Sequence, residues 1–327
     1  MTARNKHHEI LFERHGTNPI LTAAQWPYAT NSVFNPGAIR LHNGETILLC
    51  RVEDRRGLSH LHVARSTNGV DGWEISETPT FVPDPKDHPD ELWGVEDPRI
   101  TFIEELGKYA IAYTAFGWGG PGVSLALTED FVHFERLGMV FPPDDKDAAL
   151  LPRRINGRWA MIHRPVTNQG SHIWISYSPD LRHWGDHRIL MEARRGGWWD
   201  AGKIGLSPPL IETERGWIMI YHGVRTTASG SIYRIGIALF DLENPENCIL
   251  RGDKWVFGPC GMAEREGDVD NVVFPCGYTI GDDGDTINLY YGAADTSICL
   301  ATGSIRRTLD WLDRHGLPES HALHTGE

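Results

Sequence analysis

Apolar residues along the chain form short runs of four to seven positions, separated by turns that contain glycine or proline. The runs are rich in Ile, Val, Tyr and Trp, which favour strands. The clearest of them cover residues 47–50, 109–114, 159–163, 217–222 and 287–291. Helical periodicity is nearly absent. The one good helix candidate is Ile305–His315, which is followed by Gly316 and Pro318. The pattern predicts an all-β protein with a short C-terminal helix.

The strands repeat as units in which one strand carries a small central residue. Five such strands recur roughly every 50 to 64 residues, at 62–66, 124–128, 174–178, 236–240 and 299–302. A recurring four-strand unit of this length is typical of a propeller blade. We therefore expect a five-bladed β-propeller that forms a single domain over residues 1–327. Residues 1–17 are expected as an N-terminal extension, and residues 305–327 as a helix and tail. The alternative is a β-sandwich with accidental self-similarity.

The net charge limits the binding partners that we expect, and the cysteine content indicates the cellular compartment. The net charge of −13 argues against nucleic acid, whose phosphates need patches of Lys and Arg. The five cysteines are odd in number and widely spaced, which is typical of reduced thiols in a cytoplasmic protein. The N-terminus has no apolar signal segment, and no run approaches eighteen apolar residues, so we expect no membrane partner. A homo-oligomer remains open.

Charged residues lie within or beside the predicted strands, at similar points of different repeats. They are Arg51, Asp97, Arg99, Arg164, Lys203, His222 and Asp295. Equivalent points of different blades converge on the axis of a propeller, so these side chains are expected to meet in one pocket. The alternative for each of them is a buried ion pair without a function.

The balance of this set favours an anionic substrate. It holds four arginines and lysines with His222, and Lys146 as a further candidate, against few carboxylates. A glycosidase would show two carboxylates, whereas Arg side chains suit phosphate. No Walker-type loop and no cluster with zinc spacing occurs, so we expect neither a nucleotide nor a metal.

A series of short motifs follows these residues in order. They are Phe-Asn-Pro-Gly at 34–37, Cys-Arg-Val-Glu-Asp at 50–54, Gly-Val-Glu-Asp-Pro-Arg at 94–99, Ile-Asn-Gly-Arg-Trp-Ala-Met at 155–161, His-Arg-Pro at 163–165, Gly-Lys-Ile-Gly at 202–205, Tyr-His-Gly-Val at 221–224, Asn-Val-Val-Phe-Pro-Cys at 271–276 and Tyr-Gly-Ala-Ala-Asp at 291–295. Their order and spacing resemble glycoside hydrolase family 130, the mannoside phosphorylases and their relatives, from about residue 18 to about residue 305.

The resemblance implies a five-bladed propeller and an inverting reaction. Inorganic phosphate would cleave a terminal β-mannoside to give α-mannose 1-phosphate, without a cofactor. The family's general acid falls on Asp97, whose proton is thought to pass through a sugar hydroxyl. Phosphate contacts fall on Arg164, Lys203, His222 and Lys146, and substrate contacts on Asn35, Arg51, Tyr233, Asp295 and Arg99. Pro36 follows Asn35 where some relatives have Ser. The linkage, β-1,2 or β-1,4, and the acceptor sugar stay open.

Two other functions fit the same residues. A β-mannosidase of the same family would use water and would need a base, for which Glu53 or Asp54 are candidates. A glycan-binding propeller without activity would bind mannosides and turn over nothing.

Overall fold

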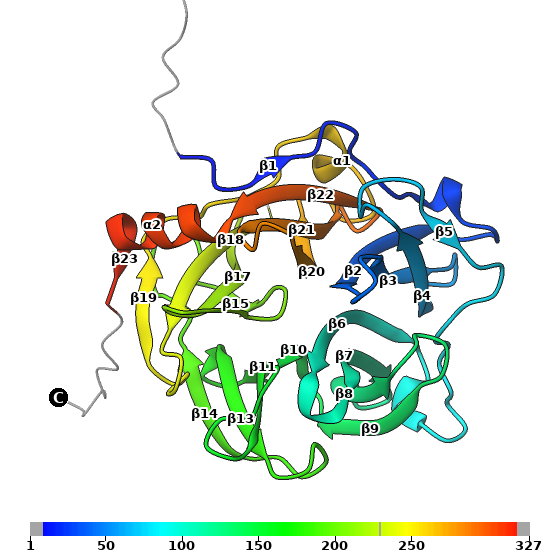
Figure 1. Cartoon of the computed structure of the whole chain (residues 1–327), viewed down its shortest axis with the longest axis horizontal. Coiled ribbons are helices and arrows are strands. Elements are labelled where there is room, and N and C mark those ends of the chain that lie inside the picture. The colour runs from blue at the N-terminus through cyan, green and yellow to red at the C-terminus, as the bar shows by residue number, and fades with distance from the viewer. Residues whose placement is uncertain (1–8, 229, 319–327) are drawn as a thin grey trace, which may run out of the picture.

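The computed structural model describes residues 9–228 and 230–318, and its strands stand in a ring around a common centre (Figure 1). Three of the sheets have four strands each. The first consists of β2 (Ser32–Arg40), β3 (Thr46–Glu53), β4 (Ser59–Ser66) and β5 (Glu74–Ile75). The second consists of β6 (Val95–Ile103), β7 (Lys108–Gly117), β8 (Gly120–Thr128) and β9 (Glu135–Phe141). The third has the strand order β1 (Glu13–Arg14), β22 (Ser297–Ser304), β21 (Thr286–Ala293) and β20 (Val273–Ile280).

The remaining strands form one sheet of eleven, which is two antiparallel groups joined by a short link. The first group is β10 (Asp145–Leu150), β11 (Trp159–Thr167), β13 (Ile173–Ser178) and β14 (Gly185–Met191). The second is β15 (Lys203–Leu206), β16 (Ile211–Thr213), β17 (Gly216–Thr227), β18 (Gly230–Phe240) and β19 (Cys248–Gly252), with β23 (Gly316–Leu317) at its edge. The link is β12 (Gly170–Ser171), which pairs with β11 and also with β15.

The predicted all-β architecture is confirmed, and the predicted strands occupy fixed places in it. The five apolar runs lie in β3, β7, β11, β17 and β21, and the five small-residue strands lie in β4, β8, β13, β18 and β22. The central small residues have no solvent exposure: they are Ala64, Ala126, Ser176, Ala238 and Ala301. Because packed interiors leave no spare volume, a larger side chain at these points would collide with its neighbours.

The core is divided into five apolar clusters, and each cluster lies between two neighbouring groups of strands. Ile175 of β13 and Trp217 of β17, for example, belong to one cluster, whereas Ile100 of β6 packs with Ile47 of β3 in another. Each sheet therefore buries both of its faces against its neighbours, which is the packing of a β-propeller-like fold.

The predicted C-terminal helix is confirmed as α2 (Ile305–His315). The Ser304 hydroxyl accepts a hydrogen bond from the Arg307 backbone N–H at 3.2 Å and caps the first turn. Trp311 and Leu312 turn inward into the core beside β18 and β22. A second helix of one turn, α1 (Met262–Arg265), was not expected from the sequence.

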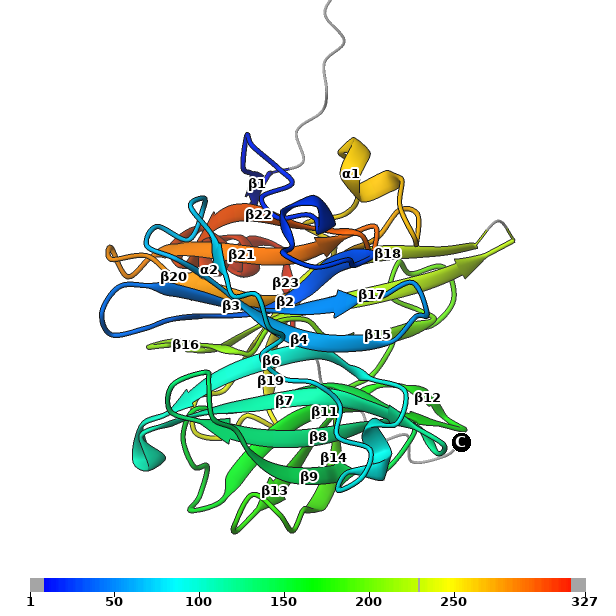
Figure 2. The ribbon, with the colours of Figure 1, turned by 90° about the vertical axis from the view of Figure 1, so that its right-hand side faces the viewer.

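The N-terminal segment differs from the expected extension. Leu11 and Phe12 are each 1 % exposed, and β1 pairs with β22 (Figure 2). The Asn18 side chain bonds both the carbonyl and the N–H of Leu300, at 2.8 and 2.9 Å. Residues 9–17 thus belong to the last sheet, because their apolar side chains complete its core. Residues 1–8 of the expected extension and 319–327 of the expected tail lie outside the described residues.

Candidate active site

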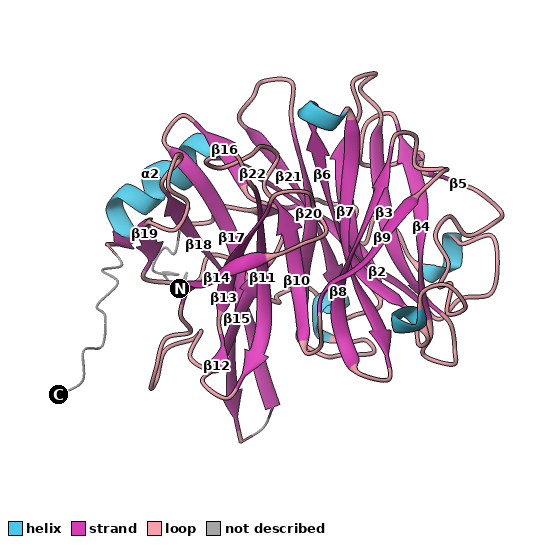
Figure 3. Cartoon of the chain, turned by 90° about the horizontal axis from the view of Figure 1, so that it is seen from below, coloured by secondary structure: helices cyan, strands magenta, loops and turns pink. Residues whose placement is uncertain are grey.

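A pocket of about 150 Å³ opens where the innermost strands begin. It takes Asn35 from β2, Asp97 from β6, Lys146 and Asp147 from β10, Lys203 from β15 and Phe274 from β20; Arg51, Arg164, His222, Tyr233, Val269, Val272 and Asp295 complete the lining. The strands run between two opposite faces of the molecule (Figure 3). Because the pocket is lined from the starts of the inner strands, it lies at one of these faces. The fold thus brings together every predicted site residue except Arg99.

Three inner strands enter the pocket through the same irregularity. In β2, β6 and β10 the register shifts by one extra residue, between Phe34 and Gly37, Glu96 and Arg99, and Lys146 and Ala149. Within these bulges Asn35, Asp97 and Asp147 have φ of 44°, 49° and 57°. Asn and Asp are the side chains that best tolerate this left-handed backbone, and a bulge redirects the side chain it carries. Three sheets therefore present a short polar group at equivalent points.

Asp97 is held by two side chains from the neighbouring sheet. Asn35 Nδ2 donates to Asp97 Oδ1 at 2.9 Å, and Arg51 Nη1 donates to the same oxygen at 3.2 Å. Burial alone would raise the pKa of Asp97, but the charges of Arg51 and Lys146 outweigh burial and hold the pKa below its usual value. Asp97 is therefore a carboxylate in this structure.

Asp147 was not among the predicted site residues, and it corrects the expectation of few carboxylates. It is 2 % exposed; its Oδ2 lies 2.8 Å from Arg164 Nε and 3.5 Å from His222 Nε2, and its Oδ1 lies 3.4 Å from Arg99 Nη2. Burial opposes the charge, but Arg164, His222 and Arg99 keep the pKa of Asp147 well below its usual range. Superposing the repeats would have found it, because it occupies the same bulge position as Asp97.

Arg99 differs from the expectation that it contacts substrate. It is 1 % exposed, and it donates to the backbone carbonyls of Ser207, Leu206 and Asp97 at 2.5, 3.0 and 3.2 Å. With Asp147 these acceptors occupy its guanidinium behind the pocket wall. Arg99 therefore links β6 to the end of β15 and holds the pocket wall in place without facing the pocket.

The cations that face the pocket come from adjacent strands. Lys146 pairs in register with Arg164, and Lys203 Nζ lies 5.6 Å from the centre of the Tyr233 ring. Neither Lys146 nor Lys203 has an ion pair within the described residues. Burial and the charge of Arg164 lower the pKa of Lys203. The pocket thus holds lysine charges that no carboxylate neutralises directly, which suits an incoming anion.

The pKa of His222 is lowered, whereas the pKa of Asp295 is raised. Burial lowers the pKa of the His222 imidazole to about 3, against the pull of Asp147, so that ring is neutral at ordinary pH. Burial and the nearby Asp97 charge raise the pKa of Asp295 to about 6. Asp295 is therefore the pocket carboxyl that binds a proton most readily near neutrality.

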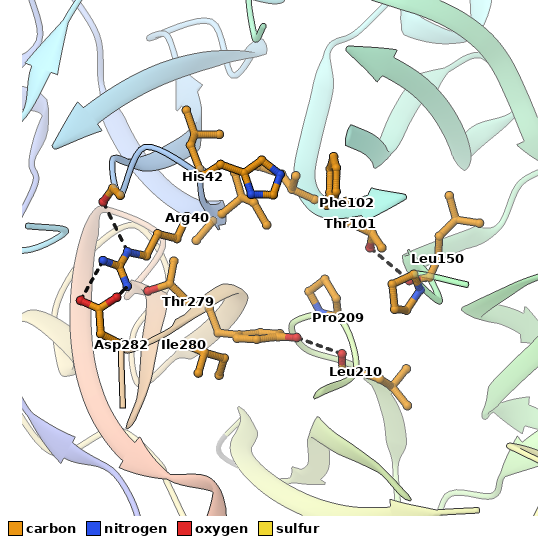
Figure 4. A pocket seen from close by; sticks show the side chains of 17 residues that line it. Arg40, His42, Thr101, Phe102, Leu150, Pro209, Leu210, Thr279, Ile280 and Asp282 are labelled. Carbon is orange, nitrogen blue, oxygen red and sulfur yellow. Dashed lines mark hydrogen bonds and ion pairs between the residues drawn. The ribbon is translucent and has the colours of Figure 1, made fainter. Parts of the chain in front are cut away.

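A larger cavity of about 500 Å³ lies at the other ends of the same inner strands (Figure 4). Several of its polar groups are already paired. Arg40 holds Asp282 with contacts of 2.5 and 3.1 Å, the Tyr278 hydroxyl donates to the Leu210 carbonyl at 3.0 Å, and the Thr101 hydroxyl donates to the Leu150 carbonyl at 3.1 Å. We place the active site in the smaller pocket, because Lys146 and Lys203 line it without an ion pair among the described residues and remain available to a ligand.

The described residues contain no candidate metal site, no helix that could span a membrane and no disulfide. No group of three or more His, Cys, Asp or Glu side chains there could hold a metal ion. The helices described are too short or too polar to cross a membrane. The five cysteines form no disulfide, and four of them are buried.

Fold and pocket define a β-propeller-like enzyme with an ionic central site. The model of glycoside hydrolase family 130, described as β-1,4-mannooligosaccharide phosphorylase, matches residues 4–314. The chain belongs to this family. It is 32 % identical over 311 residues to the β-1,4-mannooligosaccharide phosphorylase of Ruminococcus albus, covering 92 % of this chain and 91 % of that one.

Solved structures agree with this assignment. The β-1,2-mannobiose phosphorylase of Listeria innocua, in complex with β-1,2-mannobiose, superposes with a TM-score of 0.83 and 29 % identity, over 93 % of this chain and 99 % of that one. Another family-130 structure, from work on glycoside hydrolases that target β-1,2 mannosidic linkages in Candida mannan, has a TM-score of 0.80 and 27 % identity over 92 % of this chain and 96 % of that one.

Proposed function

We propose that the protein is an inverting β-mannoside phosphorylase of the glycosyltransferase class. One observation carries the proposal: the pocket is divided by charge between two parts of the ring. Asn35, Arg51 and Asp97 come from β2, β3 and β6, and Asp295 comes from the turn after β21. Lys146, Arg164, Lys203 and His222 come from β10, β11, β15 and β17, and their positive charge exceeds the negative charge of Asp147, the one carboxylate among the described residues on that side of the lining. A neutral sugar fits the first part, and phosphate fits the second.

In this arrangement phosphate attacks the anomeric carbon of the terminal mannose from the face opposite the leaving oxygen. The bond from phosphate oxygen to carbon forms as the glycosidic bond breaks, so the β-linked sugar leaves as α-mannose 1-phosphate. Lys146, Arg164 and Lys203 position the anion by charge, and neutral His222 can add one N–H hydrogen bond. Asp97 supplies the proton to the leaving oxygen through a sugar hydroxyl.

Asp97 must gain a proton before it can act, because its pKa is held low in this structure. Lys146 is one of the cations that lower it. A phosphate bound at Lys146 neutralises that charge and adds negative charge nearby, and both effects raise the pKa of a carboxyl group. Binding of one substrate thus prepares the acid for the other.

The competing hydrolase lacks a base at the place where it would be needed. Glu53 accepts from Arg51 Nη2 at 2.9 Å, and Asp54 accepts from the Arg56 backbone N–H at 2.7 Å, within its own turn. Neither of them lines the pocket. The carboxylate that lines this part of the pocket is Asp147, but Arg164 and Arg99 bind it and hold its pKa well below its usual range, so it is a weak base for water. Phosphate is already an anion and needs no base.

We further infer a single-domain propeller of five blades. The five inner strands β2, β6, β10, β15 and β20, together with the five apolar clusters, support this count. We propose that inorganic phosphate is a co-substrate and that no other cofactor takes part. A cytoplasmic location and a homo-oligomer stay predictions. The linkage that is cleaved, β-1,2 or β-1,4, is decided by the experiment below.

The deciding experiment offers β-1,2- and β-1,4-mannobiose with and without phosphate, followed by proton NMR. We expect α-mannose 1-phosphate only when phosphate is present. Brisk release of mannose without phosphate would assign a hydrolase instead. Binding of mannobiose without any turnover would assign a glycan-binding propeller, and early appearance of the β anomer would exclude a single displacement.

A further inference from the structure

The most exposed large apolar side chain in the described part of the chain is Trp118, at 82 %. It lies in the turn between β7 and β8, and its ring centre is 5.0 Å from that of Trp93, at an angle of 60°. Trp93 in turn meets Phe116 edge to face at 5.3 Å. A single exposed Trp needs no explanation, but an indole that packs against a second indole, which Phe116 in turn meets edge to face, offers a more persistent apolar surface.

This aromatic surface lies at the same end of the sheets as the pocket, because Trp118 follows the end of β7, which pairs with the start of β6, the strand that carries Asp97. Trp93 is four residues before Asp97, and its backbone N–H donates to the Phe116 carbonyl at 2.8 Å. On the other side, a Cβ at Gly119 would lie 3.2 Å from the Pro143 ring, three residues before Lys146. The surface therefore stands between the strand that carries the acid and the strand that carries a phosphate cation.

The turn is built so that the indole is its only side chain. Its sequence is Gly117-Trp118-Gly119-Gly120. A Cβ at Gly117 would lie 2.9 Å from the Asp90 carbonyl oxygen, and one at Gly120, where φ is +102°, would lie 2.7 Å from Asp144 Oδ1. The glycines thus let the backbone press against both neighbours, which fixes where Trp118 projects.

The size of the pocket leaves a use for such a surface. Its volume of about 150 Å³ is well below the ~300–1,000 Å³ usual for sites that enclose a ligand. A space of this size holds little more than a terminal sugar with phosphate, so the rest of a bound oligosaccharide would lie outside, over the rim. Hexose rings carry apolar C–H faces, and an indole offers them a matching flat face.

We propose that Trp118, supported by Trp93, is a binding platform for the mannosyl units beyond the first one on the leaving side of the scissile bond. The inference rests on the proposed function for its substrate class. It assigns to the Gly117–Gly120 turn a preference for chains of three or more units over mannobiose.

The test compares Trp118→Ala and Trp118→Phe with wild type on β-1,2- and β-1,4-linked manno-oligosaccharides of two to five units. Trp118→Ala should lower kcat/KM roughly three- to tenfold for three units and longer, with mannobiose and the KM for phosphate unchanged. Trp118→Phe should retain most of the preference. Val132→Ala is the matched control, because Val132 is 62 % exposed in the turn at the opposite end of β8.

Losses of equal size for every chain length, or no loss at all, would overturn the platform. Calorimetric binding of the same oligosaccharides to Asp97→Asn, with and without Trp118→Ala, separates this idea from the reaction. If binding depends on Trp118 and chain length but wild type turns over nothing, the proposed function fails and the platform stands. If wild type is an active phosphorylase and Trp118→Ala changes neither binding nor rate, the platform fails alone.

Discussion

Asn35 and Asp97 occupy the same bulge position in two neighbouring inner strands, and they share a hydrogen bond of 2.9 Å from Nδ2 to Oδ1. The left-handed backbone at each residue fixes the direction of its side chain. Asn35 Oδ1 is buried and has no hydrogen-bond partner among the described residues. That oxygen packs against Gly292 of β21, where any Cβ would collide with it, so Asn35 joins β2 to the last sheet while its amide nitrogen holds Asp97.

Asp97→Asn should abolish phosphorolysis and synthesis with little change in the fold. The amide keeps the shape of the side chain but cannot transfer the proton, and Arg51 retains Glu53 and Glu96 as partners. Loss of a positioned general acid costs on the order of 10²–10⁴ in rate. Steady-state rates in both directions, with the melting temperature as a control, test this. A mutant that keeps more than roughly a tenth of the wild-type rate would contradict the estimate and direct attention to Asp295.

Phosphate binding should be accompanied by proton uptake at Asp97. The pKa of Asp97 is lowered by Lys146 among others, and an anion at that lysine removes part of the lowering. Calorimetric titration of phosphate into the enzyme in buffers of different ionisation enthalpy measures the protons taken up. Asp97→Asn should take up fewer protons, and equal uptake by both proteins would assign the proton to another group.

Arg164→Ala and Lys203→Ala should raise the KM for phosphate much more than the KM for the mannoside. Each substitution removes a charge-assisted contact of about 1.5–3 kcal/mol, which is roughly ten- to a hundredfold in binding. Sulfate, which has the shape and charge of phosphate, should inhibit competitively against phosphate in the wild type and more weakly in both variants. Equal weakening of sugar and phosphate binding would show that these residues only stabilise the fold.

Asp147→Asn should destabilise the protein by about 3–5 kcal/mol, because it leaves Arg99 and Arg164 buried without their counter-charge. Urea unfolding measures the change. The control is Asp282→Asn, which removes the exposed partner of Arg40 and should change stability little. If the two variants lose the same stability, the contacts of Asp147 do not organise the site.

Asp295 should make the stability of the protein depend on pH between about pH 4 and pH 6. Its folded pKa of about 6 lies above the usual 3.8, so the fold favours the protonated form. The stability gained from protonation is fully present below about pH 4 and is lost as the pH rises towards 6. Asp295→Asn does not titrate, so the difference in unfolding free energy, wild type minus variant, should fall between those values and level off above them. A flat difference would place the raised pKa elsewhere.

The sequence predicted most of the architecture because its signals are local. Alternating apolar runs and the capped segment Ile305–His315 depend on neighbouring residues, and both appeared where expected. Two turns that follow equivalent strands, β8 and β13, have the same local structure: Asp130 and Asp180 each accept hydrogen bonds from the backbone N–H groups two and three residues later. Nine of the ten site residues also line the pocket; the family motifs contain seven of these, and Lys146 and Tyr233 lie outside the motifs.

What the sequence could not show depends on contacts between distant segments. Arg99 reads as one more cation, but its role is set by the carbonyls of Leu206 and Ser207, more than a hundred residues away. Asp147 was overlooked beside Lys146, because only the bulge reveals that it points inward. Residues 9–17 were predicted as part of an extension, because the strand with which they pair, β22, lies near the other end of the chain.

The pairing of β1 with β22 has a consequence for how the enzyme comes into being. Pocket residues extend from Asn35 to Asp295, and the sheet that carries the last of them is completed by the N-terminal strand. A chain synthesised only to residue 200 lacks Lys203, His222, Tyr233 and Asp295 of the pocket. Because each sheet buries its faces against its neighbours, we expect activity only after the last sheet has closed the ring between β2–β5 and β15–β19, and none from truncated chains.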